Sequence, residues 1–174
     1  MKIVYCIPSL YNPGGMERVL TEKVNYLANH TDFEISIITT EQKNKPLFFK
    51  LHEKVKLINF PVDFNDFTNQ SIFSKYISYR KCFSHYRELL NDYLSHNEID
   101  VCISLFGKEI EFLSKLKDPS IKIGEIHFAQ DFRKQFLASN KKRGLIWDVI
   151  GYIRTKQLIL STKKLEKIIV LTKE

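Results

Sequence analysis

Two adjacent glycines, Gly14 and Gly15, separate an apolar run at residues 2–8 from a segment with helical spacing. In that segment, apolar residues recur at three- and four-residue steps, at Met16, Val19, Leu20, Val24 and Leu27. The pattern predicts a strand, a loop and a helix that begins near Gly15. Free N–H groups at a helix N-terminus attract anions, and glycine lets a phosphate or sugar approach closely or adopts a positive φ. A tight turn without a ligand is the alternative interpretation.

His127 is the second residue whose position suggests chemistry. The apolar run at residues 121–127 predicts a strand that ends at this histidine, whereas the other four histidines fall at helix ends, in loops or on helix surfaces. Ligands of parallel α/β sheets bind outside the carboxyl ends of strands, near the point where the strand order reverses. A neutral imidazole there can hydrogen-bond to a sugar hydroxyl. The alternative is a structural histidine whose ring bonds to backbone.

Strands and helices alternate along the whole chain. Apolar runs predict strands at residues 2–8, 33–40, 55–60, 100–106, 121–127 and 167–172. Further helices are predicted at 145–165, around Ile110, Leu113 and Leu116, and along a stripe formed by Ile72, Tyr76, Tyr79, Phe83, Tyr86, Leu90 and Tyr93. This alternation predicts an α/β fold, a Rossmann-like doubly wound parallel sheet with helices on both faces. The length of 174 residues is that of one domain.

Several classes of site are missing from the sequence. It has no phosphate-binding P-loop, no Gly-x-Ser-x-Gly and no cluster of Cys, His and Asp with the spacing of metal ligands, so no metal and no bound cofactor are expected. A nucleic-acid partner is not expected either, because no recognised motif is present. No apolar stretch approaches the roughly 20 residues of a spanning helix, and Met1 leads directly into a strand. We therefore expect a cytoplasmic location.

The positive charge is concentrated in one segment. Residues 1–131 carry 16 basic and 17 acidic side chains, whereas residues 132–167 carry ten basic and two acidic ones, a net charge of +8. Its basic residues include Arg133, Lys134, Lys141, Lys142 and Arg143, with aromatic and aliphatic residues between them. This mixture favours an anionic membrane surface or another polyanion, and it suggests a peripheral position at the inner face of the membrane. A solvated helix face is the alternative.

The segment Gly14-Gly15-Met16-Glu17-Arg18 resembles the start of retaining glycosyltransferases of the GT4 family, whose N-terminal domain opens with a strand and a Gly-Gly-x-Glu-Arg loop. The resemblance extends to the strand–helix order, to His127 and to the ending at residues 167–174. It implies that residues 1–174 form the single N-terminal, acceptor-side domain of a GT-B fold. The C-terminal nucleotide-sugar domain is absent from this chain, which alone is expected to be nearly inactive.

For the full enzyme, the resemblance implies sugar transfer from a UDP- or GDP-sugar to a hydroxyl of a glycan or lipid-linked glycan, with retention, in the synthesis of cell-envelope polysaccharide. Gly14 and Gly15 would then bind the donor phosphates, and His127 would orient the sugar or the acceptor. Lys108 and Glu109 would contact the acceptor, although both can equally be the start of a helix.

Other classes of function remain open at this point. A binding module would hold a nucleotide or phosphosugar without turnover, and a membrane-docking module would act through the basic segment. Half of an epimerase with the same two-domain architecture is a related enzymatic alternative.

Overall fold

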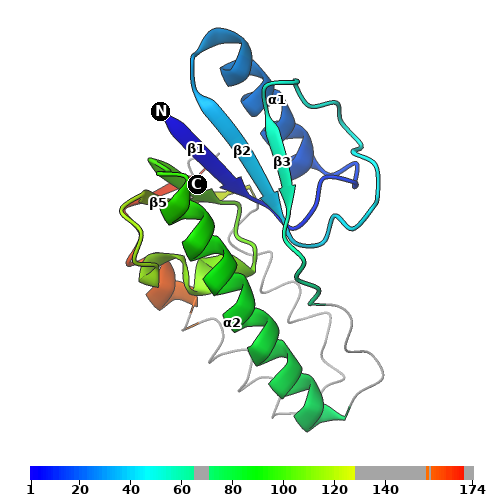
Figure 1. Ribbon diagram of the computed structural model, residues 1–174, viewed down its shortest axis with the longest axis vertical. Helices are drawn as coiled ribbons and strands as arrows, with labels where there is room; N and C mark the ends of the chain where they lie inside the picture. Colours follow the sequence, from blue (N-terminus) through cyan, green and yellow to red (C-terminus); the bar gives the residue numbers. More distant parts are fainter. Residues whose placement is uncertain (65–70, 128–155, 157, 171–174) are drawn as a thin grey trace.

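The structure, a computed structural model, describes residues 1–64, 71–127, 156 and 158–170 (Figure 1). Its elements follow the order β1 (Lys2–Cys6), α1 (Gly15–His30), β2 (Glu34–Thr39), β3 (Lys56–Asn59), α2 (Ile72–His96), β4 (Val101–Ser104), the 3₁₀ helices η1 (Lys108–Glu111) and η2 (Leu113–Lys115), β5 (Ile121–Ile126) and β6 (Lys167–Val170). Each of the six predicted strands has its counterpart. Most of the helix predicted at 145–165 lies outside the described residues.

The strands form one parallel sheet in the order β3-β2-β1-β4-β5-β6. The chain builds outward from β1 through β2 to β3, and then returns to place β4 on the other side of β1. The strand order therefore reverses between β1 and β4, where Cys6 pairs with Ser104. This topology confirms the Rossmann-like doubly wound sheet, and it places the predicted ligand-binding edge at the ends of these two strands.

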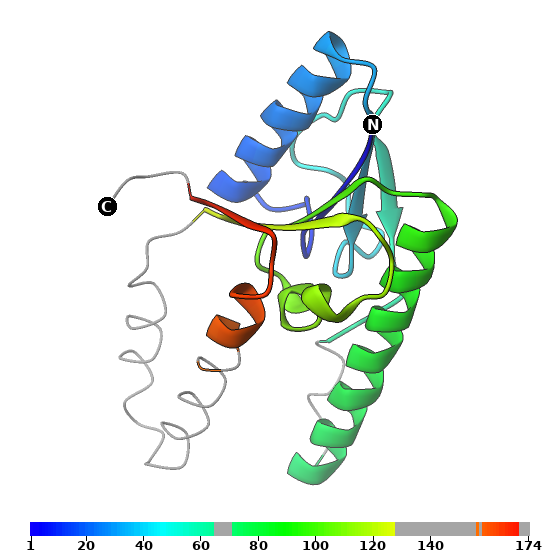
Figure 2. The same cartoon turned by 90° about the vertical axis from the view of Figure 1, so that its left-hand side faces the viewer.

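Alternating side chains of β1 enter two separate cores. Ile3 and Tyr5, together with Ile7 directly after the strand, pack in one cluster with α1, whereas Val4 and Cys6 pack in the other with α2. Both strand faces are apolar because each is covered by a helix, as expected for a parallel sheet. Figure 2 shows α1 and α2 on opposite sides of the strands.

Helix α2 follows the predicted stripe over most of its length. Tyr86 and Leu90 are fully buried, and Tyr79 and Phe83 pack against the same core. Tyr76 continues the stripe, but its side chain is 63% exposed. The first turns of this 25-residue helix extend beyond the sheet, and the core formed by the described residues does not reach beneath them (Figure 1).

The short helix predicted around Ile110 is two 3₁₀ helices. Phe112, with φ −126° and ψ −10°, leaves helical geometry between η1 and η2. Its ring packs edge-on against Phe83 and Tyr86 of α2, with centroid distances of 5.0 and 5.3 Å. Packing of this one aromatic side chain therefore accompanies the break in the helix that the apolar spacing predicted.

Candidate functional site

The loop between β1 and α1 ends at Gly14, which is the N-cap residue of α1 with φ −77° and ψ 157°. Helix α1 begins at Gly15, as predicted. Gly14 is extended, so it does not use the positive φ that glycine allows. The carboxylate at the end of the flexible Glu17 side chain lies where a Cβ on Gly14 would be, whereas the space around Gly15 is open. The N-terminus of α1 thus combines free backbone N–H groups with an accessible glycine.

The segment after β2 holds this loop in place. The buried side chain of Gln42 accepts a hydrogen bond from the backbone N–H of Leu10 at 2.7 Å and donates to the carbonyl of Lys45 at 2.8 Å. The Lys45 ammonium lies 3.9 Å from the centroid of the Tyr11 ring, close enough for a cation–π interaction. The loop that ends at Gly14 is therefore fixed by contacts from a different part of the chain.

The turn after β4 begins beside the end of β1. Leu105 donates its backbone N–H to the carbonyl of Cys6 at 3.0 Å, which joins the two strand ends. Phe106 has φ 60°, a conformation uncommon for an aromatic residue and often found at functional sites. Of the two predicted acceptor contacts that follow, Lys108 is exposed and Glu109 is buried.

Glu109 is engaged inside the protein. Its carboxylate accepts hydrogen bonds from Ser104 Oγ at 2.5 Å, Gly107 N at 3.1 Å and the Tyr86 hydroxyl at 3.2 Å. Burial raises the pKa of Glu109, and these neutral donors offset only part of that effect. Burial and the neighbouring Glu109 carboxylate also raise the pKa of Tyr86. The carboxylate of Glu109 thereby ties the turn after β4 to α2.

His127 directly follows β5, at the carboxyl edge of the sheet. Its side chain is 3% exposed, and its Nε2 lies 2.9 Å from Oε1 of the buried Glu125. The same oxygen accepts a hydrogen bond from the ammonium of Lys23 on α1. Both ring nitrogens of His127 are buried, and neither forms a hydrogen bond within the part of the chain that the structure describes.

The pKa of Glu125, beside His127 and Lys23, shifts in the opposite direction to that of Glu109. Burial favours a raised pKa for Glu125, but the opposing effects of His127 and Lys23 are larger, and the pKa is lowered overall. Burial and the Glu125 charge together raise the pKa of Tyr5 to about 12. Glu125 is therefore a buried anion that connects α1, which starts at Gly15, to the strand that ends before His127.

The sequence did not single out Glu125 or Lys23. A signal for Glu125 exists, since a carboxylate within the apolar strand 121–126 needs a buried partner. No comparable signal identifies Lys23, because it lies 102 residues away from Glu125 and has the usual place of a lysine on a helix.

The basic residues Arg133, Lys134, Lys141, Lys142 and Arg143 all lie outside the described residues. Within the described ranges, no group of three or more His, Cys, Asp and Glu is arranged to hold a metal ion. No helix in the same ranges is both long and apolar enough to cross a membrane.

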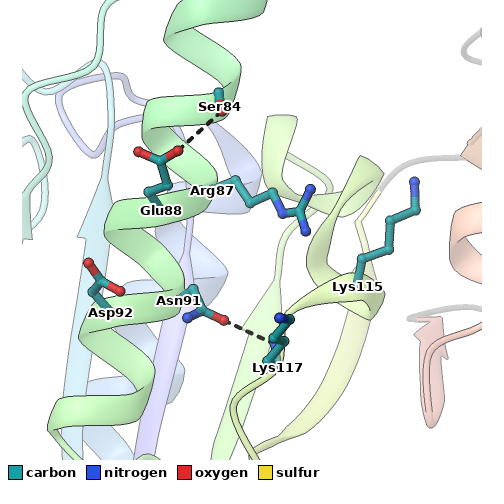
Figure 3. A pocket seen from close by; sticks show the side chains of 7 residues that line it. All are labelled: Ser84, Arg87, Glu88, Asn91, Asp92, Lys115 and Lys117. Carbon is teal, nitrogen blue, oxygen red and sulfur yellow. Dashed lines mark hydrogen bonds between the residues drawn. The ribbon is translucent and has the colours of Figure 1, made fainter.

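Two open grooves of about 300 and 340 Å³ lie away from the carboxyl edge of the sheet. Figure 3 shows the first groove, where Arg87 and Asn91 of α2 point toward the segment that carries Lys115 and Lys117, and Asn91 Oδ1 accepts a hydrogen bond from the backbone N–H of Lys117. The second lies beside the start of β2, between Thr31 and Lys56. Neither groove is lined by Gly14, Lys108 or His127.

No family model and no curated protein matches the chain. A solved structure of Phytolacca americana UGT2, complexed with UDP-2-fluoro-glucose and pterostilbene, is similar in fold with a TM-score of 0.54 and 17% sequence identity. The match covers 99% of this chain and 48% of the other, so this chain spans about half the length of that protein. The likeness shows a Rossmann-like domain fold of the GT-B type. It does not distinguish GT4 from other families that share this fold.

Proposed function

We propose that this chain is the acceptor-side domain of a glycosyltransferase that moves a sugar from a nucleotide sugar to an acceptor hydroxyl. The observation that supports the proposal most strongly is the fold, since 99% of the chain aligns with a protein that was solved with a UDP-sugar analogue and an acceptor. The second half of the active site would lie in a nucleotide-sugar domain beyond residue 174. Coverage of only 48% of the UGT2 chain supports this division.

The donor diphosphate would bind at the N-terminus of α1. Gly14 and Gly15 leave room at the backbone, and the N–H groups and the helix dipole would stabilise the negative charge that develops on the leaving group. The carboxylate of Glu17 now lies against Gly14, the position that an anion would take. A bound phosphate would therefore displace this side chain.

His127 and Lys108 would contact the sugars from the neighbouring strand ends. Nδ1 of His127 would bond to a sugar hydroxyl once it becomes accessible, since this atom is buried in the structure. Glu125 lies against Nε2 on the other side of the ring, and Lys23 contacts Glu125. Lys108 would contact the acceptor from the turn after β4, and Glu109 would fix that turn from within. The donor would be a UDP- or GDP-sugar, the acceptor a glycan or lipid-linked glycan, and the transfer would retain configuration, as in GT4 enzymes.

The test is turnover of a panel of UDP- and GDP-sugars by three proteins: the full-length product of the gene, residues 1–174, and the full-length His127→Ala variant. We expect turnover by the full-length protein, almost none by residues 1–174, and a loss of at least about 100-fold in kcat/KM for the variant. Tight nucleotide-sugar binding without turnover by any form would support a binding module instead. Full activity of residues 1–174 would contradict the two-domain proposal.

A further inference from the structure

The first turns of α2 expose a compact group of large apolar side chains. Phe73 is 75% exposed, Tyr76 63% and Ile77 40%. Phe73 and Ile77 lie one helical turn apart, and Tyr76 borders them. Three large apolar residues exposed on two adjacent turns are more than the scattered single residues that an ordinary surface carries.

These side chains are exposed because α2 is longer than the surface that it covers. The C-terminal half of the helix is buried through Tyr86, Leu90 and Leu94, whereas its N-terminal turns, called the front of α2 below, extend past the carboxyl ends of the strands. Figures 1 and 2 both show the first turns of α2 projecting beyond the sheet. The projecting turns lie on the side of the molecule to which the ends of β1 and β4 point.

Positive charge surrounds the same turns. Lys75, Arg80 and Lys81 are exposed, and none of them forms an ion pair with another described residue. The helix has no acidic residue in its first turn, and the first one along it is Glu88. Within the described residues of α2, the first turns therefore present apolar and basic groups, and no acidic residue precedes Glu88.

We propose that the front of α2, formed by Phe73, Lys75, Tyr76, Ile77, Arg80 and Lys81, docks on an anionic lipid surface. Charge complementarity selects this occupant: the basic groups match lipid phosphates, while the apolar side chains enter the boundary between headgroups and acyl chains. The amphipathic ring of Tyr76 suits that boundary. A purely apolar partner surface would leave three cations without partners.

The residues of this surface are not those of the basic segment that contains Lys141, Lys142 and Arg143, which lies outside the described residues. The inference deepens the proposed function, because docking through α2 would bring the carboxyl edge of the sheet toward lipid-linked acceptors. It is nevertheless measured by vesicle binding without turnover. A failure of vesicle binding and a failure of sugar transfer can therefore be told apart.

The experiment is flotation of residues 1–174 with phosphatidylcholine vesicles, either pure or with about one third phosphatidylglycerol. Tyr76→Ser tests the apolar part and has a closely matched control in Tyr26→Ser, since Tyr26 is a helical tyrosine with 62% exposure, against 63% for Tyr76. The double variant Arg80→Glu/Lys81→Glu tests the charges. Its control is Lys54→Glu/Lys56→Glu, two exposed lysines beside the start of β3. Equal unfolding midpoints for all variants would establish that each one is folded.

We expect binding to the anionic vesicles only, a loss of about tenfold or more in the partition coefficient for Arg80→Glu/Lys81→Glu, and a loss of several-fold for Tyr76→Ser. Both control variants should bind like the original chain. Equal binding to neutral vesicles, no binding to either kind, or losses that are as large in the controls would overturn the proposal. So would a loss that occurs only on replacing Lys141, Lys142 and Arg143 by serine.

Discussion

The two faces of the sheet each bury one glutamate near the carboxyl ends of the strands, and the two carboxylates are held in different ways. Glu125, on the α1 face, contacts the ammonium of Lys23 and the imidazole of His127. Glu109, on the α2 face, accepts hydrogen bonds from two hydroxyls and a backbone N–H, all neutral. Burial acts on both, yet the pKa is lowered for Glu125 and raised for Glu109.

The comparison shows that the kind of partner, rather than burial alone, sets the charge at this edge. The Lys23 ammonium favours the ionised carboxylate of Glu125, whereas neutral donors only reduce the cost of burying a carboxylate. The α1 face therefore holds a fixed negative charge next to His127, while the α2 face holds a carboxyl group that fixes a turn. The following predictions test this difference, from the largest expected effect to the smallest.

Glu125→Ala should cause the largest loss of stability. It removes the buried anion from both Lys23 and His127, a change that costs about 3–5 kcal/mol for a fully buried pair. Lys23 is 32% exposed and can turn toward water, so we expect about 2 kcal/mol in the free energy of unfolding. Urea unfolding of the variant and the original chain at neutral pH measures this difference in the free energy of unfolding. A loss below about 0.5 kcal/mol would show that Glu125 is not a structural anion.

Glutamine at the two positions should separate the two environments directly. Glu125→Gln removes the charge that Lys23 contacts, and we expect it to lower the free energy of unfolding by about 1–2 kcal/mol. Glu109→Gln keeps an oxygen for Ser104 and Gly107 and removes a buried charge, so its effect should stay within about 0.5 kcal/mol. Urea unfolding of both variants at one pH gives the comparison. Equal losses would contradict the assigned difference in charge.

Acid should affect the two glutamates with opposite sign. The pKa of Glu125 is lowered from 4.5, so its contribution to stability is complete above about pH 5 and is lost as the pH falls through the lowered pKa. The pKa of Glu109 is raised from 4.5, so its ionisation reduces stability as the pH rises from about 4 through the raised pKa. The stability difference between the original chain and Glu125→Gln should therefore shrink on acidification. The difference between Glu109→Gln and the original chain should grow as the pH rises.

Arg18→Ala should have the smallest effect. Arg18 pairs with Glu22 at 2.8 Å on the same helix as Lys23, but both side chains are about two-thirds exposed. Water and salt screen such a pair, so we expect no measurable shift of the urea midpoint. A shift as large as that of Glu125→Ala would mean that α1 itself, rather than the buried anion, accounts for the loss.

Much of the fold could be predicted from the sequence, because apolar runs and helical stripes report burial within a short window. The start of α1 at Gly15 and the strand at 34–39 follow from such local patterns. The exposure of Tyr76 could not be predicted, since the same stripe continues past the point where the sheet ends. Neither could the break at Phe112, which is accompanied by packing of this ring against α2.

The candidate site was predictable only in its backbone positions. Gly14 and His127 mark strand ends, and strand ends can be recognised from the apolar pattern. The contacts of these residues depend on distant parts of the chain: Gln42 reaches Leu10, and Lys23 reaches Glu125. Such contacts are set by strand order, which local sequence patterns do not encode.

The most direct test of the central claim is a crystal structure of the full-length gene product with an unreactive analogue of whichever nucleotide sugar it uses. The account predicts diphosphate oxygens within hydrogen-bond distance of the backbone at Gly14 and Gly15, and a sugar hydroxyl on Nδ1 of His127. A donor bound without contact to either place, or in the groove between Arg87 and Lys117, would contradict it.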